Sequence, residues 1–196
     1  VKLPDGSLWR NDVLTEEKSK VAETLKEFRG NYRYNQLDAN VRRFNSEVMQ
    51  VWQWDDHEVT NDFAGGAPAA SDPRFATTQG LINDTPLFEN GLAAFQEYNP
   101  IRDVFTGDTG DSRTAGERDL YRFNRFGSDA ASFLLDTRSF RDPELVAPNT
   151  ANPADVARFL NESLTLDRTL LGADQLSRLK ADLLTADQSG ITWKFV

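Results

Sequence analysis

Hydrophobic positions recur at helical spacing in five segments of the chain. Val21, Leu25 and Phe28 follow an acidic first turn, which predicts a helix from Thr15 that stops at Gly30. Residues 36–46 repeat the same i, i+4, i+7 spacing and predict a second amphipathic helix. Proline, asparagine and glycine signals at the ends of the other three segments predict helices over 85–98, 152–160 and 172–184.

Short runs of β-branched and aromatic residues alternate with these helices. The run Val48–Trp54 is typical of a strand, and 121–126 and 131–136 flank a Gly-Ser-Asp turn that predicts a β-hairpin. Residues 191–196 predict a last strand. The alternation of helices and strands favours a layered α/β domain with a mixed sheet flanked by helices. An apolar strand at the last residue leads us to expect that the chain is a fragment that continues in the intact protein.

Composition excludes several classes of protein. A chain of 196 residues with 39% hydrophobic and 11% aromatic residues is globular rather than disordered. It has no apolar run near the ~20 residues of a membrane span. The absence of cysteine excludes thiolate metal sites and thiol nucleophiles, and the single histidine argues against a catalytic zinc site. A net charge of −9 argues against a nucleic-acid-binding surface.

An acidic motif, Trp54–Glu58, follows the first predicted strand directly. Loops beyond the carboxyl ends of strands bind ligands in α/β folds, and the Gly- and Pro-rich loop 61–73 is a candidate wall of such a site. No Lys or Arg occurs between Arg43 and Arg74. Without a local countercharge, clustered carboxylates have raised pKa values or require a hard cation, with His57 as a ligand or proton donor. The carboxylates of this stretch are Glu47, Asp55, Asp56, Glu58, Asp62 and Asp72.

Simpler interpretations remain open at this point. Acidic loops are more often merely solvated. The arginine-rich stretch 113–141 contains as many acids, so ion pairs are expected there rather than an oxyanion site. Trp52 and Trp54 are expected to pack rather than to stack on a ligand. Asp55 and Asp56 make a weak glycosidase pair, because adjacent strand residues point to opposite faces.

The stretch Trp54–Asp62 closely resembles the W-D-D-H-E-V-x-N-N signature of the PhoD-like alkaline phosphatases, a family of metallophosphoesterases. Further segments resemble the family in the family's order, and together they cover nearly the whole chain. The resemblance therefore implies that residues 1–196 are the central part of a PhoD-like domain, truncated at both ends. These segments are 4–10, 17–34, 98–102, 135–141, 171–176 and 192–196.

The resemblance implies a layered metallophosphoesterase-like fold and metal-dependent hydrolysis of phosphate mono- and diesters. It implies that Asp56 is a metal ligand and that His57 stabilises the transition state or protonates the leaving oxygen. Asp62 stands where the family has a second Asn, so the role of this position is left open. Arg102 and Arg138 match family motifs, and we expect structural pairing of both. The residues expected to orient the site around the metal ligand are Asp55, Glu58 and Asn61.

Calcium and iron are the metals that the resemblance implies, with manganese or magnesium as alternatives, and the implied location is extracytoplasmic. The family's Gly-Asp motif and cysteine ligand would precede residue 1, and its late histidine motif would follow residue 196. We therefore expect the isolated chain to hold an incomplete site and to be inactive. A catalytically silent structural or interaction module is the alternative. The sequence leaves the oligomeric state open.

Overall fold

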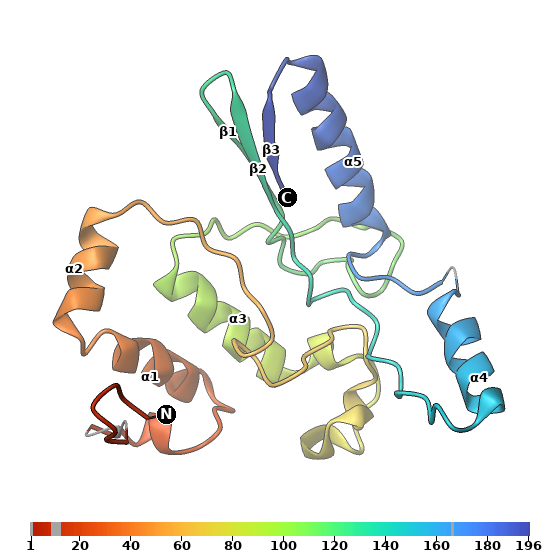
Figure 1. Ribbon diagram of the computed structural model, residues 1–196, viewed down its shortest axis with the longest axis horizontal. Coiled ribbons are helices and arrows are strands. Elements are labelled where there is room, and N and C mark those ends of the chain that lie inside the picture. Colours follow the sequence, from red (N-terminus) through yellow and green to blue (C-terminus); the bar gives the residue numbers. More distant parts are fainter. Residues whose placement is uncertain (1, 9–12, 166) are drawn as a thin grey trace. The chain divides into compact units, whose positions relative to one another are not determined.

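The computed structural model describes residues 2–8, 13–165 and 167–196 (Figure 1). The chain forms two compact units, Val1–Gln50 and Val51–Val196. Trp9 and Arg10, which carry part of the family resemblance, lie outside the described residues. The first unit contains the 3-10 helix η1 (Glu17–Ser19) and the helices α1 (Leu25–Asn35) and α2 (Ala39–Glu47). The second unit contains η2 (Ala69–Ser71), η3 (Pro73–Phe75), η4 (Ile82–Asp84), α3 (Pro86–Tyr98), β1 (Arg122–Phe126), β2 (Ala130–Leu134), α4 (Pro153–Ser163), α5 (Ala173–Gln188) and β3 (Trp193–Phe195).

The first helix begins and ends later than the sequence pattern predicts. α1 starts at Leu25 because Thr24 and Glu27 form a capping box, in which the Glu27 carboxylate accepts the Thr24 N–H at 3.0 Å. Gly30 is not a stop signal, since the helix continues to Asn35. Its missing side chain instead leaves room for Glu17 of η1, which lies where a Cβ would point.

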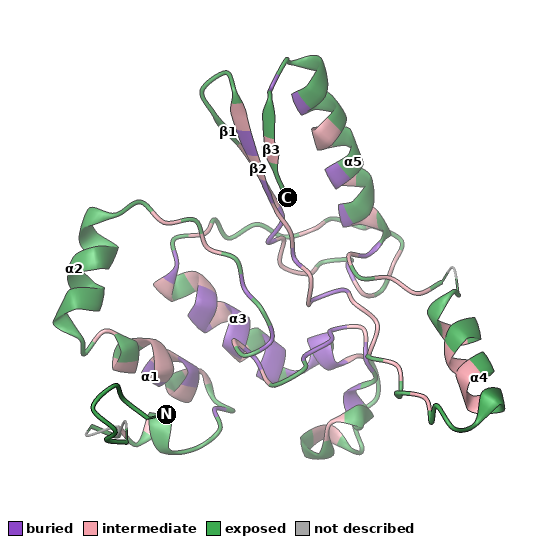
Figure 2. Cartoon of the chain, in the orientation of Figure 1, coloured by how far each residue is buried: buried purple, intermediate pink, exposed green. Residues whose placement is uncertain are grey.

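The second helix forms where it was predicted but buries little surface. Asp38 caps α2 by accepting the backbone N–H groups of Asn40 at 2.7 Å and Val41 at 3.2 Å. None of its nine residues is buried, and Figure 2 shows the whole helix as exposed. The apolar stripe that predicts this helix therefore remains exposed along Val41 and Phe44.

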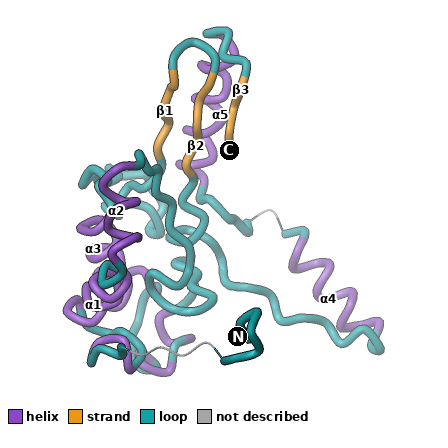
Figure 3. Tube along the Cα trace, turned by 60° about the vertical axis from the view of Figure 1, so that its left-hand side comes forward, coloured by secondary structure: helices purple, strands orange, loops and turns teal. Residues whose placement is uncertain are grey.

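The second unit is built around the predicted mixed sheet. β1 pairs antiparallel with β2 through the predicted hairpin, and β2 pairs parallel with β3. α5 packs on one face of the sheet, where Leu179 and Ala186 contact a buried cluster that includes Phe133 of β2 (Figure 3). Each fully buried apolar side chain contributes roughly 1.5–3 kcal/mol to folding. The mixed α/β architecture predicted from the sequence is confirmed.

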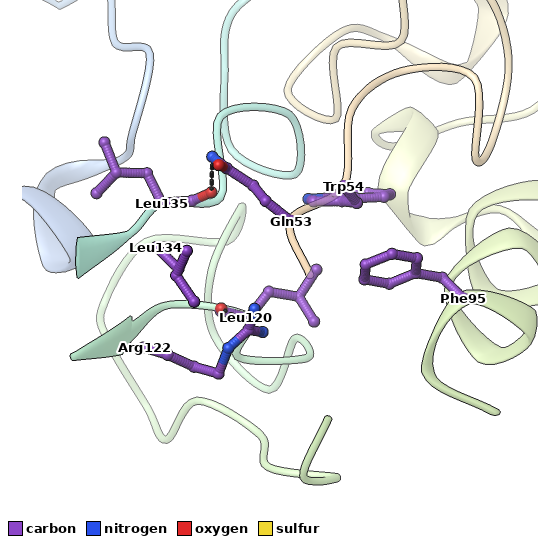
Figure 4. Close-up of a pocket in the computed structure, with 7 residues that line it drawn as sticks. All are labelled: Gln53, Trp54, Phe95, Leu120, Arg122, Leu134 and Leu135. Carbon is purple, nitrogen blue, oxygen red and sulfur yellow. Dashed lines mark hydrogen bonds between the residues drawn. The ribbon is translucent and has the colours of Figure 1, made fainter. Parts of the chain in front are cut away.

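The strand predicted at Val48–Trp54 is wrong. Residues 48–54 form no strand, and the part at 52–54 is joined to the sheet by side chains instead of a backbone ladder. The Gln53 amide donates to the Leu135 carbonyl at 2.9 Å (Figure 4). The Arg122 guanidinium donates to the Trp52 carbonyl. β-propensity indicates that a segment suits a strand. It does not indicate whether a neighbouring strand is available to form backbone hydrogen bonds with that segment.

Trp54 ends this segment inside an aromatic cluster. Its indole is 3% exposed and lies 5.8 Å from the Phe88 ring and 6.4 Å from the Phe95 ring of α3, centroid to centroid. Phe63, from the loop that follows, lies 6.0 Å away and stacks on Phe88. The expectation that Trp54 packs is confirmed, and the cluster fixes the start of the acidic motif against α3.

α3 also approaches the acidic loop through Gly91. A Cβ added there would lie 2.5 Å from the Glu58 carbonyl oxygen. Helix propensity alone would make Gly91→Ala stabilising by about 1 kcal/mol. We expect instead a loss of about 1–3 kcal/mol in the free energy of unfolding, because a backbone atom must move. Urea titration checks this, with Gly107→Ala, which meets no atom within 4 Å, as the control. Stabilisation by Gly91→Ala would contradict the packing.

Candidate active site

The acidic motif folds into one tight turn. The N–H groups of Val59 and Thr60 donate to the Asp56 carbonyl at 2.9 and 2.8 Å. The Glu58 carboxylate closes the start of the turn by accepting the Asp55 N–H at 2.7 Å. The turn leaves Asp56 buried, whereas the side chain of His57 is 76% exposed.

Asp56 is an ionised carboxylate with partners of its own. One oxygen, Oδ2, accepts the Asp62 N–H at 2.7 Å, and the other, Oδ1, lies 3.9 Å from Nη2 of Arg138. Burial raises the pKa of Asp56. The Asp62 N–H, Arg138 and His57 together lower it by more, so the pKa of Asp56 is below its ordinary value. Oδ1 is therefore the oxygen that remains free of a hydrogen-bonded donor within the described part of the chain.

The expectation that the loop has no countercharge is wrong. Arg138, 83 residues from Asp55 in the chain, donates from Nε to the Asp55 carboxylate at 2.5 Å and from Nη1 to the Phe63 carbonyl at 3.3 Å. Arg74 binds Asp72 at 2.6 Å and lowers the pKa of that carboxyl. The pairing expected for Arg138 is confirmed. Because these cations compensate the loop, carboxylate repulsion alone is no argument for a metal ion.

A buried carboxylate behind the loop connects Trp54 to Arg138. Asp136 is fully buried, and its Oδ1 accepts the Trp54 indole N–H at 2.9 Å and the N–H groups of Arg138 and Ser139 at 3.0 and 2.9 Å. Its Oδ2 accepts the Ser139 hydroxyl at 2.5 Å. Burial raises the pKa of Asp136, and the four donors oppose that shift. The sequence pattern did not identify Asp136 as part of the site, although an Asp side chain that accepts the backbone N–H two residues later is a common turn feature.

Asp136 is also tied to α5 by its own backbone. Its N–H donates to the side-chain carbonyl of Gln175, whose amide donates back to the Asp136 carbonyl, both at 2.8 Å. Asp136 therefore connects three parts of the chain: the acidic motif, α5, and the segment that follows β2. It also holds the backbone of Arg138 in the position from which the guanidinium reaches Asp55.

The other arginines behave largely as expected. Arg113 pairs with Asp142 and Arg118 with Asp103, both at 2.8 Å, which confirms structural ion pairs in the arginine-rich stretch. Arg122 differs, since its guanidinium donates to backbone carbonyls. The pairing expected for Arg102 is not found in the described part of the chain, where that side chain is exposed and forms no ion pair.

A cleft of ≈250 Å³ opens on the Asn61 side of the loop. Its lining includes Phe63 and Ile82, and Thr60, Asn61 and Asp62 contribute polar groups. The Gly- and Pro-rich loop was expected to form a wall beside the acidic motif. The cleft agrees with this expectation, because the loop contributes Ala67, Ser71, Asp72 and Pro73 to its lining.

The residues predicted for the site therefore share one turn, but they do not make a metal centre by themselves. Among residues 2–8, 13–165 and 167–196, no group of three His, Asp or Glu side chains is placed to hold a metal ion. Asp56 contributes one free carboxylate oxygen, while Asp55 is engaged by Arg138 and Glu58 by the Asp55 N–H. The described residues alone do not fit a metal ion.

Comparison with known proteins identifies the relatives of the chain. The sequence profile of the PhoD-like phosphatases matches residues 1–196. The chain is 29% identical over 154 residues to alkaline phosphatase D of Bacillus subtilis (strain 168), which covers 78% of this chain and 23% of that protein. A solved structure of PhoD superposes with a TM-score of 0.62 and 26% identity, covering 88% of this chain and 29% of that one. Within the described residues, no helix combines the length and apolar character needed to cross a membrane.

Proposed function

The chain belongs to the PhoD-like phosphatase family, and from this membership and the geometry of the acidic turn we propose that it supplies part of the active site of a metal-dependent phosphatase and phosphodiesterase. The observation that carries the proposal is the profile match over residues 1–196, which includes the turn that holds Asp56 beside an exposed His57. The substrate is a phosphate mono- or diester.

We propose that Asp56 is a metal ligand through its free oxygen and that His57 stabilises or protonates the leaving oxygen. Asp55, Glu58 and Asn61 hold these two side chains in place, each through a hydrogen bond within the turn or to Arg138. The implied ions are calcium and iron, with manganese or magnesium as alternatives. When bound, they would activate water and neutralise phosphoryl oxygens.

The chain spans about a quarter of the length of its relatives, 23% of one and 29% of the other. We propose that residues 1–196 are the central part of a longer PhoD-like domain and that the remaining ligands lie outside this chain. The isolated chain is then inactive, and the complete protein acts outside the cytoplasm. The absence of a three-ligand group in the described residues also favours a second function, that of a silent structural module. Ester hydrolysis by the isolated 196-residue chain with added metal would refute both the inactivity of this chain and the silent module.

The test is the turnover of a small aryl phosphate by the protein that contains this chain. We expect His57→Ala to lower kcat about a hundredfold, because the leaving oxygen loses its partner in the transition state, with little change in KM. Gln79→Ala, an exposed change nearby in the sequence, is the control and should leave kcat unchanged. Unchanged turnover by His57→Ala would overturn the role of this residue.

A further inference from the structure

One side chain joins the two ends of the site loop, the segment 56–62 that carries the residues proposed for the active site. Arg138 donates from Nε to the carboxylate of Asp55, directly before this loop, at 2.5 Å. From Nη1 it donates to the carbonyl oxygen of Phe63, directly after the loop, at 3.3 Å. A single guanidinium therefore closes the site loop.

The backbone of Arg138 is anchored on both sides. Its N–H donates to Oδ1 of the buried Asp136 at 3.0 Å, and its carbonyl oxygen accepts the Gly65 N–H at 2.9 Å. A Cβ added to Gly65 would lie 1.9 Å from the Ser139 carbonyl oxygen, so a glycine is required for the two segments to approach this closely. The guanidinium therefore extends from a backbone that is held firmly beside the end of the site loop.

The guanidinium also approaches Asp56 without occupying the free oxygen of this carboxylate. Nη2 of Arg138 lies 3.9 Å from Oδ1 of Asp56, which is too far for a hydrogen bond but close enough for the two charges to attract each other. The Arg138 side chain is 17% exposed, so water and salt screen this attraction less than that of a surface ion pair. Arg138 therefore orients the Asp56 carboxylate and leaves Oδ1 open.

We infer that Arg138 is a positioning residue of the active site, which closes the site loop and so fixes the backbone that carries Asp56 and His57. The role requires the fork of the guanidinium, because Nε and Nη1 bind different partners at the same time, whereas a lysine ammonium is a single point of charge. The effect on hydrolysis rests on the proposed function, whereas the closure of the loop rests on these contacts alone.

Hydrogen exchange of the 196-residue chain tests the closure without a measurement of activity. The N–H groups of Val59, Thr60 and Asp62 are bonded to Asp56 inside the site loop, so their exchange rates report on its opening. We expect Arg138→Met to speed their exchange about tenfold or more, and Arg138→Lys to have nearly the same effect. The exchange of the amides that pair β1 with β2 should not change.

Arg118→Met is the matched control for this experiment. The Arg118 side chain is as buried as that of Arg138, at 17% exposed, and it pairs with Glu89 and Asp103, which lie outside the site loop. The three amides should therefore exchange as in the parent chain. Unchanged exchange in Arg138→Met would overturn the closure. Parent-like exchange in Arg138→Lys would overturn it as well, because charge without the fork would then suffice.

The turnover of an aryl phosphate by the protein that contains this chain tests the effect on catalysis. We expect Arg138→Met to lower kcat about thirtyfold and to change KM less than about threefold, because misplaced groups weaken the transition state more than substrate binding. Arg138→Lys should recover less than about threefold of this loss, and Arg118→Met should leave kcat and KM unchanged. An unchanged kcat in Arg138→Met, or full recovery in Arg138→Lys, would overturn the positioning role.

The failure of this inference is distinguishable from the failure of the proposed function. If His57→Ala lowers kcat and Arg138→Met does not, the proposed function stands and the positioning role of Arg138 is refuted. If the protein hydrolyses no phosphate ester, the effect of Arg138 on hydrolysis fails together with the proposed function. The exchange rates still decide in that case whether Arg138 closes the site loop.

Discussion

Asp136→Ala is expected to lower the free energy of unfolding by about 4 kcal/mol or more. The substitution leaves three N–H groups and one hydroxyl without an acceptor in a site that water does not reach. Each unsatisfied buried donor costs about 1–3 kcal/mol. The Trp54 indole and the backbone of Arg138 would lose their common anchor together.

Urea titration followed by tryptophan fluorescence measures this effect, and two variants separate its causes. Asp136→Asn keeps one carbonyl oxygen as an acceptor, and the Ser139 hydroxyl can turn to accept its amide, so we expect a loss of only about 1–2 kcal/mol. Asp55→Ala removes an exposed partner of Arg138 and should cost less than about 1 kcal/mol. Equal losses for Asp136→Ala and Asp55→Ala would show that Asp136 is not the anchor.

Local signals in the sequence predict most elements of the fold. Pro86 favours the first turn of α3, and the glycine turn favours the hairpin of β1 and β2. Both signals act within their own segment, and both elements form where expected. The start of α1 was predicted from Thr15, whereas the capping box at Thr24 determines it. Thr15 and Thr24 are both local signals for the start of this helix. The packing of Glu17 against Gly30, which depends on the tertiary fold, distinguishes them.

The candidate site shows what sequence proximity cannot predict. The resemblance to the PhoD-like family identified the turn from Trp54 to Asp62, and these residues do come together. The countercharge was missed because Arg138 lies 83 residues away, and a gap in basic residues along the chain says nothing about folding partners. Asp136 was missed for the same reason, since its role depends on an indole from a distant segment. Long-range pairs of this kind follow from the tertiary fold rather than from spacing.

If Asp56 is a metal ligand, as we propose, Asp56→Ala is expected to lower kcat/KM for an aryl phosphate about a thousandfold in the protein that contains this chain, because a bound metal ion supplies several kcal/mol of transition-state stabilisation. Within the turn, the substitution also frees the Asp62 N–H from Oδ2 and removes the buried charge that faces Arg138. Asp55→Ala removes a carboxylate that is 69% exposed and should cost less than about tenfold.

Asp56→Asn distinguishes a ligand from a charge that merely shapes the turn. The asparagine carbonyl can accept the Asp62 N–H or ligate a metal, but its uncharged amide no longer balances Arg138. We expect this variant to recover about tenfold or more of the activity lost in Asp56→Ala, with metal content, measured by mass spectrometry, recovering in parallel. Full metal content in Asp56→Ala would refute the ligand role. Activity that recovers in Asp56→Asn without metal would assign Asp56 to the turn alone, because the hydrogen bond to Asp62 would then account for the whole effect.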